Sequence, residues 1–340
     1  MENLLHQLME AQSLPLLFAI IAIFIYTLAW GASKLVEEAV TLSLRCGIPK
    51  ILIGATIISI GTTLPEASVS VFAAITGNPE LALGNAVGSI ICDTGVSLGL
   101  ATVLSPPPLN KKIVNRQGWI QLGAGILLVL ACIPYRNLNK TFLEGGSLPQ
   151  YIGFVFLFLL IIYLWWTLKC VKTDNEETTA NEENGNRGSS STTYTLFKVF
   201  FSIVTIVISS RILIPAVTET AVRLHVPDSI IAATVVAFGT SLPELITCLT
   251  AVTKGHGELA IGNIIGADIL NILFVAGSAS AVTLGGLSAP PHFFQILFPA
   301  MLIILITFRI GITFSKDKLS RPFGFILLGI YATFTIMSYI

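Results

Sequence analysis

The sequence predicts an all-α membrane protein with ten transmembrane helices arranged as two inverted five-helix repeats. Three observations predict this fold: the composition, the number of long apolar segments, and an internal repeat. Of the 340 residues, 54% are hydrophobic and 11% are charged, whereas soluble domains average about 25% charged residues. The composition therefore excludes a soluble globular enzyme and a disordered chain. Lys plus Arg equals Asp plus Glu at 19 each, so no excess positive charge favours nucleic-acid binding.

Ten apolar segments are long enough to cross a bilayer, which takes about 20 apolar residues in a helix. The first and sixth segments are long enough to cross with a tilt, and the fourth is close to the lower limit of length. Turn-forming sequences rich in Gly, Pro and Asn separate several of them. The predicted spans are 14–44, 49–76, 81–104, 118–134, 150–170, 195–223, 228–253, 259–284, 292–310 and 322–339.

One hydrophilic segment, residues 171–194, divides the chain into two halves of five spans, 1–170 and 195–340. Its acidic, Gly- and Ser-containing sequence predicts a polar cytoplasmic loop. A linker is favoured over a regulatory ion sensor, because the segment has no EF-hand spacing.

The distribution of Lys and Arg predicts the orientation, because cytoplasmic connections carry an excess of both residues. With the N-terminus outside, the inner connections carry fourteen of them: Arg45, Lys50, Lys111, Lys112, Arg116, Lys169, Lys172, Arg187, Lys198, Lys254, Arg309, Lys316, Lys318 and Arg321. The outer connections carry three: Arg136, Lys140 and Arg223. Lys34 and Arg211 fall inside spans and do not count. We therefore expect a multi-pass protein of the cell membrane with both termini outside.

The second and third spans repeat in the seventh and eighth. A shift of 178 residues aligns residues 49–93 with 227–271 without a gap, from Pro49 with Pro227 to Asp93 with Asn271. Of the 45 aligned positions, 18 are identical. The matches include Gly, Thr, Pro, Glu and Asn, which chance similarity between two apolar helices does not explain. Since each half has an odd number of spans, the copies enter the membrane from opposite sides. Inverted repeats of this kind are typical of secondary transporters that work by alternating access around a midplane site.

Each repeat contains a proline within a polar motif, GTTLPE at 61–66 and GTSLPE at 239–244. Pro65 and Pro243 are predicted inside spanning helices, where a proline leaves the carbonyl four residues earlier without its partner. Such a carbonyl is tolerated at membrane depth if it lines a polar cavity or binds a cation. A plain proline kink is the alternative for either motif alone, but the glutamate that follows each proline favours a site.

Glu66 and Glu244 are the decisive residues, because a carboxylate near the centre of a membrane helix costs roughly 2.5–3.5 kcal/mol. A bound cation offsets this cost. Carboxylate, hydroxyl and carbonyl oxygens suit hard ions such as Ca²⁺ and Na⁺, and the absence of thiols and imidazoles in these motifs disfavours zinc or copper. A structural ion pair with Lys34 or Arg211 is the alternative, although it leaves the matched hydroxyls unexplained.

The segments GNAVGSIICD (84–93) and GNIIGADILN (262–271) add further polar residues. Their glycines are spaced four apart, as in helices that approach each other closely. Ser89 and Asp93 share a helix face, and Asn271 replaces Asp93 in the second copy. Two questions stay open: whether the paired asparagines, Asn85 and Asn263, bond across helices or bind ions, and whether Asp268 faces the cavity or is solvated near a helix end.

These motifs resemble the α-repeats of the Ca²⁺/cation antiporter superfamily, specifically its sodium/calcium exchanger branch. That family has G-[ST]-[ST]-x-P-E followed by G-N-x-x-G-S-N-x-x-[ND], and the resemblance is most specific across 49–100 (α-1) and 227–278 (α-2). It implies four ion sites at the midplane, with Ca²⁺ held centrally by Glu66 and Glu244. The ligands implied by motif position are Glu66, Thr62, Thr63, Ser89 and Asp93 from the first repeat, Glu244, Thr240, Ser241 and Asn271 from the second, and the carbonyls of Ser59 and Ala237.

The chain departs from the family pattern at three places. Ile90 stands where the family usually has Asn, and Ala267 stands where a serine opposite Ser89 is expected. Asp93 and Asn271 are exchanged relative to many relatives, so the carboxylate total is kept but its placement is mirrored. The GNxxE pattern of the proton/calcium branch is absent, because Gly88 and Gly266 occupy its last position.

The resulting hypothesis is an antiporter that exchanges Ca²⁺ for Na⁺ by alternating access, with no cofactor beyond the transported ions. Its expected partners are Ca²⁺, Na⁺ and the lipid bilayer, with no nucleic acid and no obligate protein partner. Coupling to H⁺ or K⁺ is the alternative within the same class, and a channel or a scaffold without transport is less favoured. An enzyme is not expected, because the chain has neither HExxH nor GxSxG.

Overall fold

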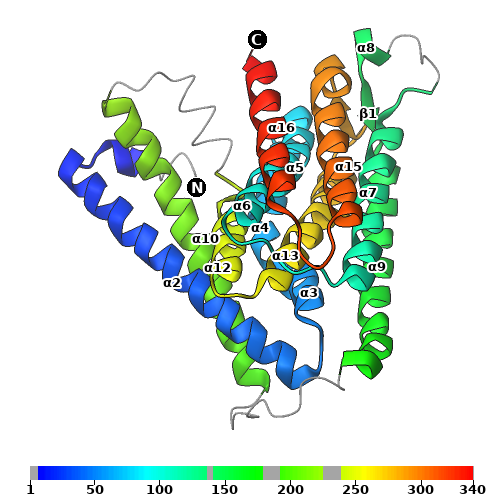
Figure 1. The fold of residues 1–340 in the computed structure, drawn as a ribbon. Coiled ribbons are helices and arrows are strands. Elements are labelled where there is room, and N and C mark those ends of the chain that lie inside the picture. The colour runs from blue at the N-terminus through cyan, green and yellow to red at the C-terminus, as the bar shows by residue number, and fades with distance from the viewer. Residues whose placement is uncertain (1–6, 136–140, 179–191, 225–238, 340) are drawn as a thin grey trace.

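The computed structural model describes residues 7–135, 141–178, 192–224 and 239–339, and almost all of them are helical (Figure 1). Spans two and three of the first half each contain a π-helical segment between two α-helices. The elements of this half are α2 (Leu14–Cys46), α3 (Lys50–Ile53), η1 (Gly54–Ile58), α4 (Ser59–Ile75), α5 (Pro79–Cys92), η2 (Asp93–Ser97), α6 (Leu98–Leu104), α7 (Lys111–Cys132), α8 (Thr141–Glu144), β1 (Gly146–Leu148) and α9 (Gln150–Thr178).

The second half has a corresponding order as far as it is described. Its elements are α10 (Thr192–Arg223), α12 (Leu242–Thr253), α13 (Gly257–Leu270), η5 (Asn271–Ala276), α14 (Gly277–Val282), β2 (Leu287–Ala289), η6 (Phe293–Leu297), α15 (Phe298–Phe314) and α16 (Arg321–Tyr339). Within the described parts of the chain, nine helices are long and apolar enough to cross a membrane. These nine correspond to nine of the ten spans that the sequence predicts.

The differences lie at span ends. The predicted span 228–253 is described only from residue 239, where α12 forms its last part, and 225–238 lie outside the described residues. The predicted start at residue 118 is wrong: α7 begins at Lys111, after Asn110 accepts a hydrogen bond from the Ile113 amide (3.4 Å). The apolar segment starts later than the helix because Lys111, Lys112 and Arg116 lie in its first turns. Both ends of the predicted loop 171–194 are helical, because α9 continues to Thr178 and α10 starts at Thr192.

The repeat-bearing helix α13 lies at the centre of the molecule. In the apolar window of the span Gly257–Val282, 94% of residues are buried, against 17% for α2 and 11% for α16. The long helices α2 and α10 pack against each other along one side of the bundle (Figure 1). The span that carries the second repeat is therefore shielded by the other helices, whereas α2 and α16 are largely exposed on the outside of the bundle.

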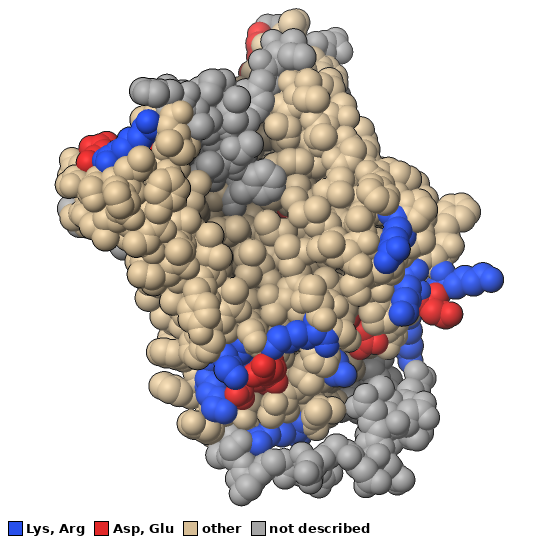
Figure 2. Space-filling view, turned by 60° about the vertical axis from the view of Figure 1, so that its left-hand side comes forward, with Lys and Arg blue, Asp and Glu red and all other residues tan. Residues whose placement is uncertain are grey.

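Connections that the sequence places on the same side of the membrane do meet in space. The Leu109 amide donates to the Asp317 carbonyl (2.7 Å), β1 pairs with β2 in an antiparallel ribbon, and Arg223 donates to the carbonyls of Gln12 and Glu10. In Figure 1, α2 begins and α16 ends at the upper end, whereas α9 ends and α10 begins at the lower end. In Figure 2, most of the visible Lys and Arg side chains lie in the lower half and at mid-height, and few lie toward the upper end.

Arg309 is an exception to the assignment of basic residues to connections. It lies within α15, and its side chain is buried against α7 instead of reaching into the connection. Its guanidinium stacks over the Trp119 ring, 4.4 Å from the ring centroid, and donates to Asn115 Oδ1 (3.1 Å). An arginine that is bound in this way contributes to helix packing and does not report on orientation.

Glycines allow the first repeat to approach α13 at backbone distance. A Cβ atom at Gly262 would lie 2.0 Å from the Ile51 carbonyl oxygen, and one at Gly266 would lie 2.5 Å from the Ala55 carbonyl oxygen. From the other side, a Cβ at Gly54 would lie 2.5 Å from the Leu259 carbonyl oxygen. The sequence expectation of close helix approach is thus confirmed for the second copy of the motif.

We expect Gly262→Ala to destabilise the protein, because a backbone carbonyl cannot move aside as a side-chain end can. Overpacking of this kind costs about 1–3 kcal/mol. The matched control is Gly84→Ala, the equivalent position of the first repeat, where an added Cβ would meet only Phe293 Cζ at an ordinary 3.7 Å. Thermal unfolding of both purified variants in detergent checks this. Equal midpoints for the two variants would contradict it.

Candidate ion-binding site

Glu66 and Glu244 are both buried in the interior of the bundle. Glu66 lies in the middle of α4 and Glu244 in the first turn of α12, and their exposed fractions are 0% and 1%. Within the described residues, none of their four carboxylate oxygens has a hydrogen-bond partner. The two carboxylates lie within electrostatic range of each other. The structure therefore brings the decisive residue of each repeat into one region, with the acidic oxygens left open.

The hydroxyl groups of each motif lie near the carboxylates of the other repeat. Thr62 and Thr63 are polar neighbours of Glu244, and Ser241 is a polar neighbour of Asp93. The hydroxyls of Thr63, Ser89 and Ser241 are buried and have no hydrogen-bond partner within the described chain. A polar region assembled across the repeat interface can change when the two repeats move relative to each other.

The two proline motifs differ locally. Pro65 lies inside α4, as predicted. Pro243 lies in the first turn of α12, after a turn at residues 239–241. The prediction that it interrupts the interior of a helix is therefore wrong for the described residues. Pro243 is the second residue of α12, and a proline in the first turn breaks no intrahelical hydrogen bond, because the first N–H groups of a helix have no partner within it. The structure therefore does not support the prediction that Pro243 deprives the Gly239 carbonyl of a helical hydrogen bond.

Asp93 and Asn271 each begin a π-helical segment, η2 and η5. Both residues are buried, and neither the Asp93 carboxylate oxygens nor Asn271 Oδ1 has a partner among the described residues. π-Helical turns inside α-helices are frequent at functional sites because they displace the following side chains. The matched interruptions at these two repeat-related positions were not predicted from the sequence.

The question left open for Asp268 is answered by its contacts. The residue is fully buried, and its Oδ2 accepts hydrogen bonds from Thr94 Oγ1 (2.5 Å) and Gln121 Nε2 (2.5 Å). It is therefore not solvated at a helix end. Sequence reasoning missed Gln121, although two buried glutamines four residues apart in the apolar span α7, Gln117 and Gln121, are the kind of signal that could have found it.

The two repeat asparagines behave differently. Asn85 Nδ2 donates across helices to the Glu66 carbonyl (3.3 Å) and to Ser70 Oγ (3.0 Å), and its Oδ1 accepts from Thr240 (3.4 Å). Its contacts thus support bonding between helices. Asn263 is 1% exposed, and neither atom of its amide has a partner in the described part of the chain. Asn85 holds the backbone at Glu66, whereas Asn263 keeps an open amide.

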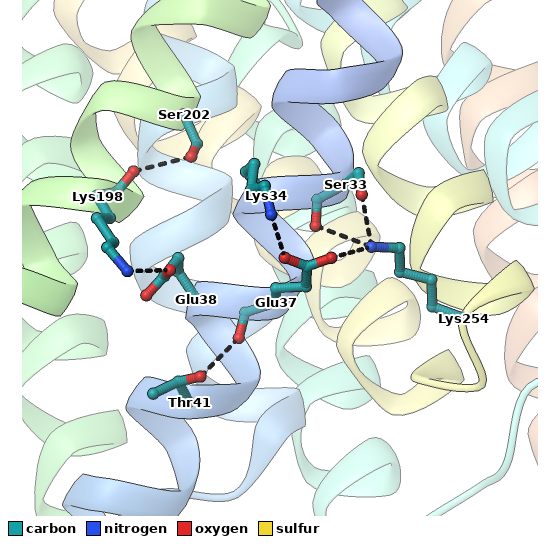
Figure 3. Close-up of polar contacts among 8 residues, drawn as sticks. All are labelled: Ser33, Lys34, Glu37, Glu38, Thr41, Lys198, Ser202 and Lys254. Atoms are coloured by element: carbon teal, nitrogen blue, oxygen red, sulfur yellow. Dashed lines mark hydrogen bonds and ion pairs between the residues drawn. The ribbon is translucent and has the colours of Figure 1, made fainter. Parts of the chain in front are cut away.

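The alternative of a structural ion pair finds no support for Lys34. Lys34 pairs with Glu37 (2.8 Å), which also binds Lys254 (2.8 Å), as Figure 3 shows. Arg211 donates to the Pro65 carbonyl (3.0 Å), and its charge acts on Glu66 from there without a hydrogen bond to either carboxylate oxygen. Arg211 thus partly balances the negative charge of the region but does not satisfy the Glu66 oxygens.

The remaining predicted ligands divide into two groups. Ser59 is buried next to Gly266, its hydroxyl donates to the Thr56 carbonyl (3.2 Å), and its carbonyl accepts a long bond from Thr62 (3.4 Å). Ala237 lies outside the described residues. In the described ranges, no three Asp, Glu, His or Cys side chains converge closely enough to hold a metal. A cation here would need hydroxyl, amide and carbonyl oxygens besides carboxylates, which fits the six to eight oxygen ligands that Ca²⁺ takes.

The fold and these residues define a class of protein. A multi-pass helical bundle in which two repeats each place a buried carboxylate in the interior is a secondary transporter of small ions, because buried carboxylates in membrane segments mark ion pathways. The sodium/calcium exchanger protein family model matches residues 16–169 and 194–340, and the chain belongs to this family. It is accordingly an integral membrane antiporter and not an enzyme.

Relatives and solved structures agree with this assignment. The chain is 30% identical to the uncharacterised membrane protein MJ0091 of Methanocaldococcus jannaschii, over 89% of this chain and 92% of the relative. It is 27% identical to the sodium/calcium exchanger MaX1 of Methanosarcina acetivorans, over 94% and 97%. A structure of the sodium-calcium exchanger NCX_Mj, at 27% identity, superposes with a TM-score of 0.78 and covers 96% of this chain and 99% of that one.

We expect Asn85→Leu to destabilise the ion-free protein and Asn263→Leu not to. The first removes hydrogen bonds between α4 and α5 and should lower the free energy of unfolding by about 1 kcal/mol per bond. The second removes an amide without a described partner and should be neutral or stabilising. Thermal unfolding in detergent with chelator checks this, and equal destabilisation by both substitutions would contradict it.

Proposed function

We propose that the protein exchanges Ca²⁺ for Na⁺ across the cell membrane by alternating access at a site built from both repeats. The observation that carries the proposal is the pair of buried carboxylates, Glu66 and Glu244, whose oxygens have no partner in the described chain. Ionised carboxylates in a low-dielectric interior are stable only when they are paired, protonated or bound to a cation. Cation binding is therefore what this pair is suited to do.

The site would be supplied by three kinds of oxygen ligand. Glu66 and Glu244 bind Ca²⁺ centrally, with Asp93 and Asn271 at the flanks, and hydroxyl and carbonyl oxygens complete the shell and hold Na⁺. This set is Glu66, Glu244, Asp93, Asn271, Thr62, Thr63, Thr240, Ser241, Ser89, and the carbonyls of Ser59 and Ala237. The named function of the relatives MaX1 and NCX_Mj supports Na⁺ and Ca²⁺ as the exchanged ions.

Exchange follows from the charge of the site. An empty carboxylate cluster crosses from one access state to the other at a high electrostatic cost, whereas a cluster filled by Ca²⁺ or by Na⁺ ions does not. Because both cations bind the same carboxylates, each excludes the other, and return of the site requires a counter-ion. With both termini outside and the predicted polar segment 171–194 inside, Na⁺ entry drives Ca²⁺ export.

Sealed vesicles that contain the full-length protein should take up ⁴⁵Ca²⁺ when an outward Na⁺ gradient is imposed. Glu66→Gln and Glu244→Gln each remove one charged ligand, so we expect uptake to fall about tenfold or more, which corresponds to 1.4 kcal/mol or more of binding. The matched control is Glu80→Gln, whose carboxylate is half exposed at the start of α5. This control should keep normal exchange.

The same vesicles separate the proposal from its alternative. Replacing the Na⁺ gradient by a proton or K⁺ gradient should abolish uptake. Uptake that ignores the Na⁺ gradient but follows a pH or K⁺ gradient would replace Na⁺ by H⁺ or K⁺ as the coupling ion. Uptake that needs no counter-ion gradient and survives both glutamate substitutions would refute exchange at this site altogether.

A further inference from the structure

Asp268 is a fourth buried carboxylate that the internal repeat does not supply. Its equivalent in the first repeat is Ile90, so only the second half carries it. The three groups of its hydrogen-bonded cluster come from three elements: Asp268 from α13, Thr94 from η2 and Gln121 from α7. Gln121 Nε2 is also 3.4 Å from Thr94 Oγ1, which closes the cluster. Helix α7 lies outside both repeat motifs.

The hydrogen bonds of Asp268 are one-sided. Oδ2 accepts from both Thr94 and Gln121, whereas Oδ1 is buried and has no partner in the described part of the chain. Two donors on one oxygen suit an ionised carboxylate, since charge-assisted hydrogen bonds are the stronger ones. The second oxygen of such a group needs a positive partner when it is shielded from water.

Two further residues with unsatisfied polar atoms belong to the elements that hydrogen-bond Asp268, η2 and α7. Asp93, which directly precedes Thr94, is fully buried with both oxygens free of described partners, and it lies within electrostatic range of Asp268. On α7, Gln117 lies one turn before Gln121 on the same face. It is fully buried, and neither atom of its amide has a partner among the described residues. The three elements that meet at Asp268 thus each carry a buried oxygen without a described partner.

We propose that Asp268 and Asp93 together bind Na⁺ at a lateral position between α13 and η2, with Thr94 and Gln121 fixing the orientation of Asp268. One monovalent cation offsets the repulsion between the two carboxylates. The open oxygens are fewer than the six to eight that Ca²⁺ takes, and no three acidic side chains converge within the described residues. This inference rests on the proposed exchange of Na⁺ and adds a ligand to it.

A feature of the repeat supports the same assignment. Ser89 of the first repeat is replaced by Ala267 in the second, so the second repeat offers no hydroxyl at that position. Asp268 is the next residue along the chain, and it supplies a carboxylate on the second half only. The ion region is therefore asymmetric, and its second half depends on a residue that the repeat comparison passes over.

The test is ²²Na⁺ binding to the purified full-length protein in detergent without Ca²⁺. Asp268→Asn keeps the size of the side chain and removes its charge, so we expect either one fewer Na⁺ bound per chain or an affinity about tenfold weaker. ⁴⁵Ca²⁺ binding without Na⁺ should stay within about threefold of wild type, because Glu66 and Glu244 are untouched. Asp317→Asn, an exposed acid in a connection, is the matched control.

Gln121→Met provides a second variant that leaves both carboxylates in place. It removes one donor from Oδ2 and should weaken ²²Na⁺ binding severalfold while Ca²⁺ binding is kept. Unchanged number and affinity of bound Na⁺ in folded Asp268→Asn overturns the inference, and so does unchanged binding in Gln121→Met if Asp268→Asn does not fold. Wild type that binds Na⁺ through Asp268 but shows no Na⁺-driven Ca²⁺ uptake supports this site and overturns the proposed exchange.

Discussion

The constraint on which the structure depends is the burial of carboxylates inside a bundle surrounded by lipid. Glu66, Asp93, Glu244 and Asp268 are all at most 1% exposed, and no lysine or arginine among the described residues satisfies their open oxygens. The charge of Arg211 acts on Glu66, but its guanidinium donates to the Pro65 carbonyl. Protein interiors tolerate unpaired charge poorly. The negative charge of these carboxylates is therefore balanced only when cations bind from outside. Structure and ion binding are therefore parts of one energetic balance.

Backbone packing makes this arrangement compact. Because Gly54, Gly262 and Gly266 have no Cβ atoms, the first-repeat span and α13 touch at backbone distance, which places Ser59 and Glu66 beside the second repeat. The first copy of the glycine motif packs less closely against its neighbours, since a Cβ atom at Gly84 would make only an ordinary contact with Phe293. Equivalent glycines thus serve one tight and one looser contact. A difference of this kind between repeats is what two alternating states require, because one interface must loosen when the other closes.

Much of this was predictable because the lipid environment restricts the fold. Apolar length predicts the nine spans that the structure describes, and the internal repeat locates Glu66 and Glu244 from the sequence alone. The failures have local causes. The polar first turn of α7 hid its start at Lys111, and the π-helical segments at Asp93 and Asn271 have no known sequence signature in these motifs. Gln121 was passed over because it lies outside the repeats, and only its contact with Asp268 reveals its importance.

The asymmetry between the halves bears on how the ions share the site. If the repeats were equivalent, each would offer the same ligands, and the two flanks of a central ion would bind equally. Here the first half contributes Ser89 and Asp93, whereas the second contributes Ala267, Asp268 and Asn271. Asp268 is fixed by Gln121 of α7, a helix outside the repeat motifs, while Asp93 has no such support in the described chain. A rearrangement that separates α7 from α13 would remove the Gln121 donor of Asp268, whereas its Thr94 donor comes from η2. The flank anchored by α7 is therefore the one whose affinity would change most between access states.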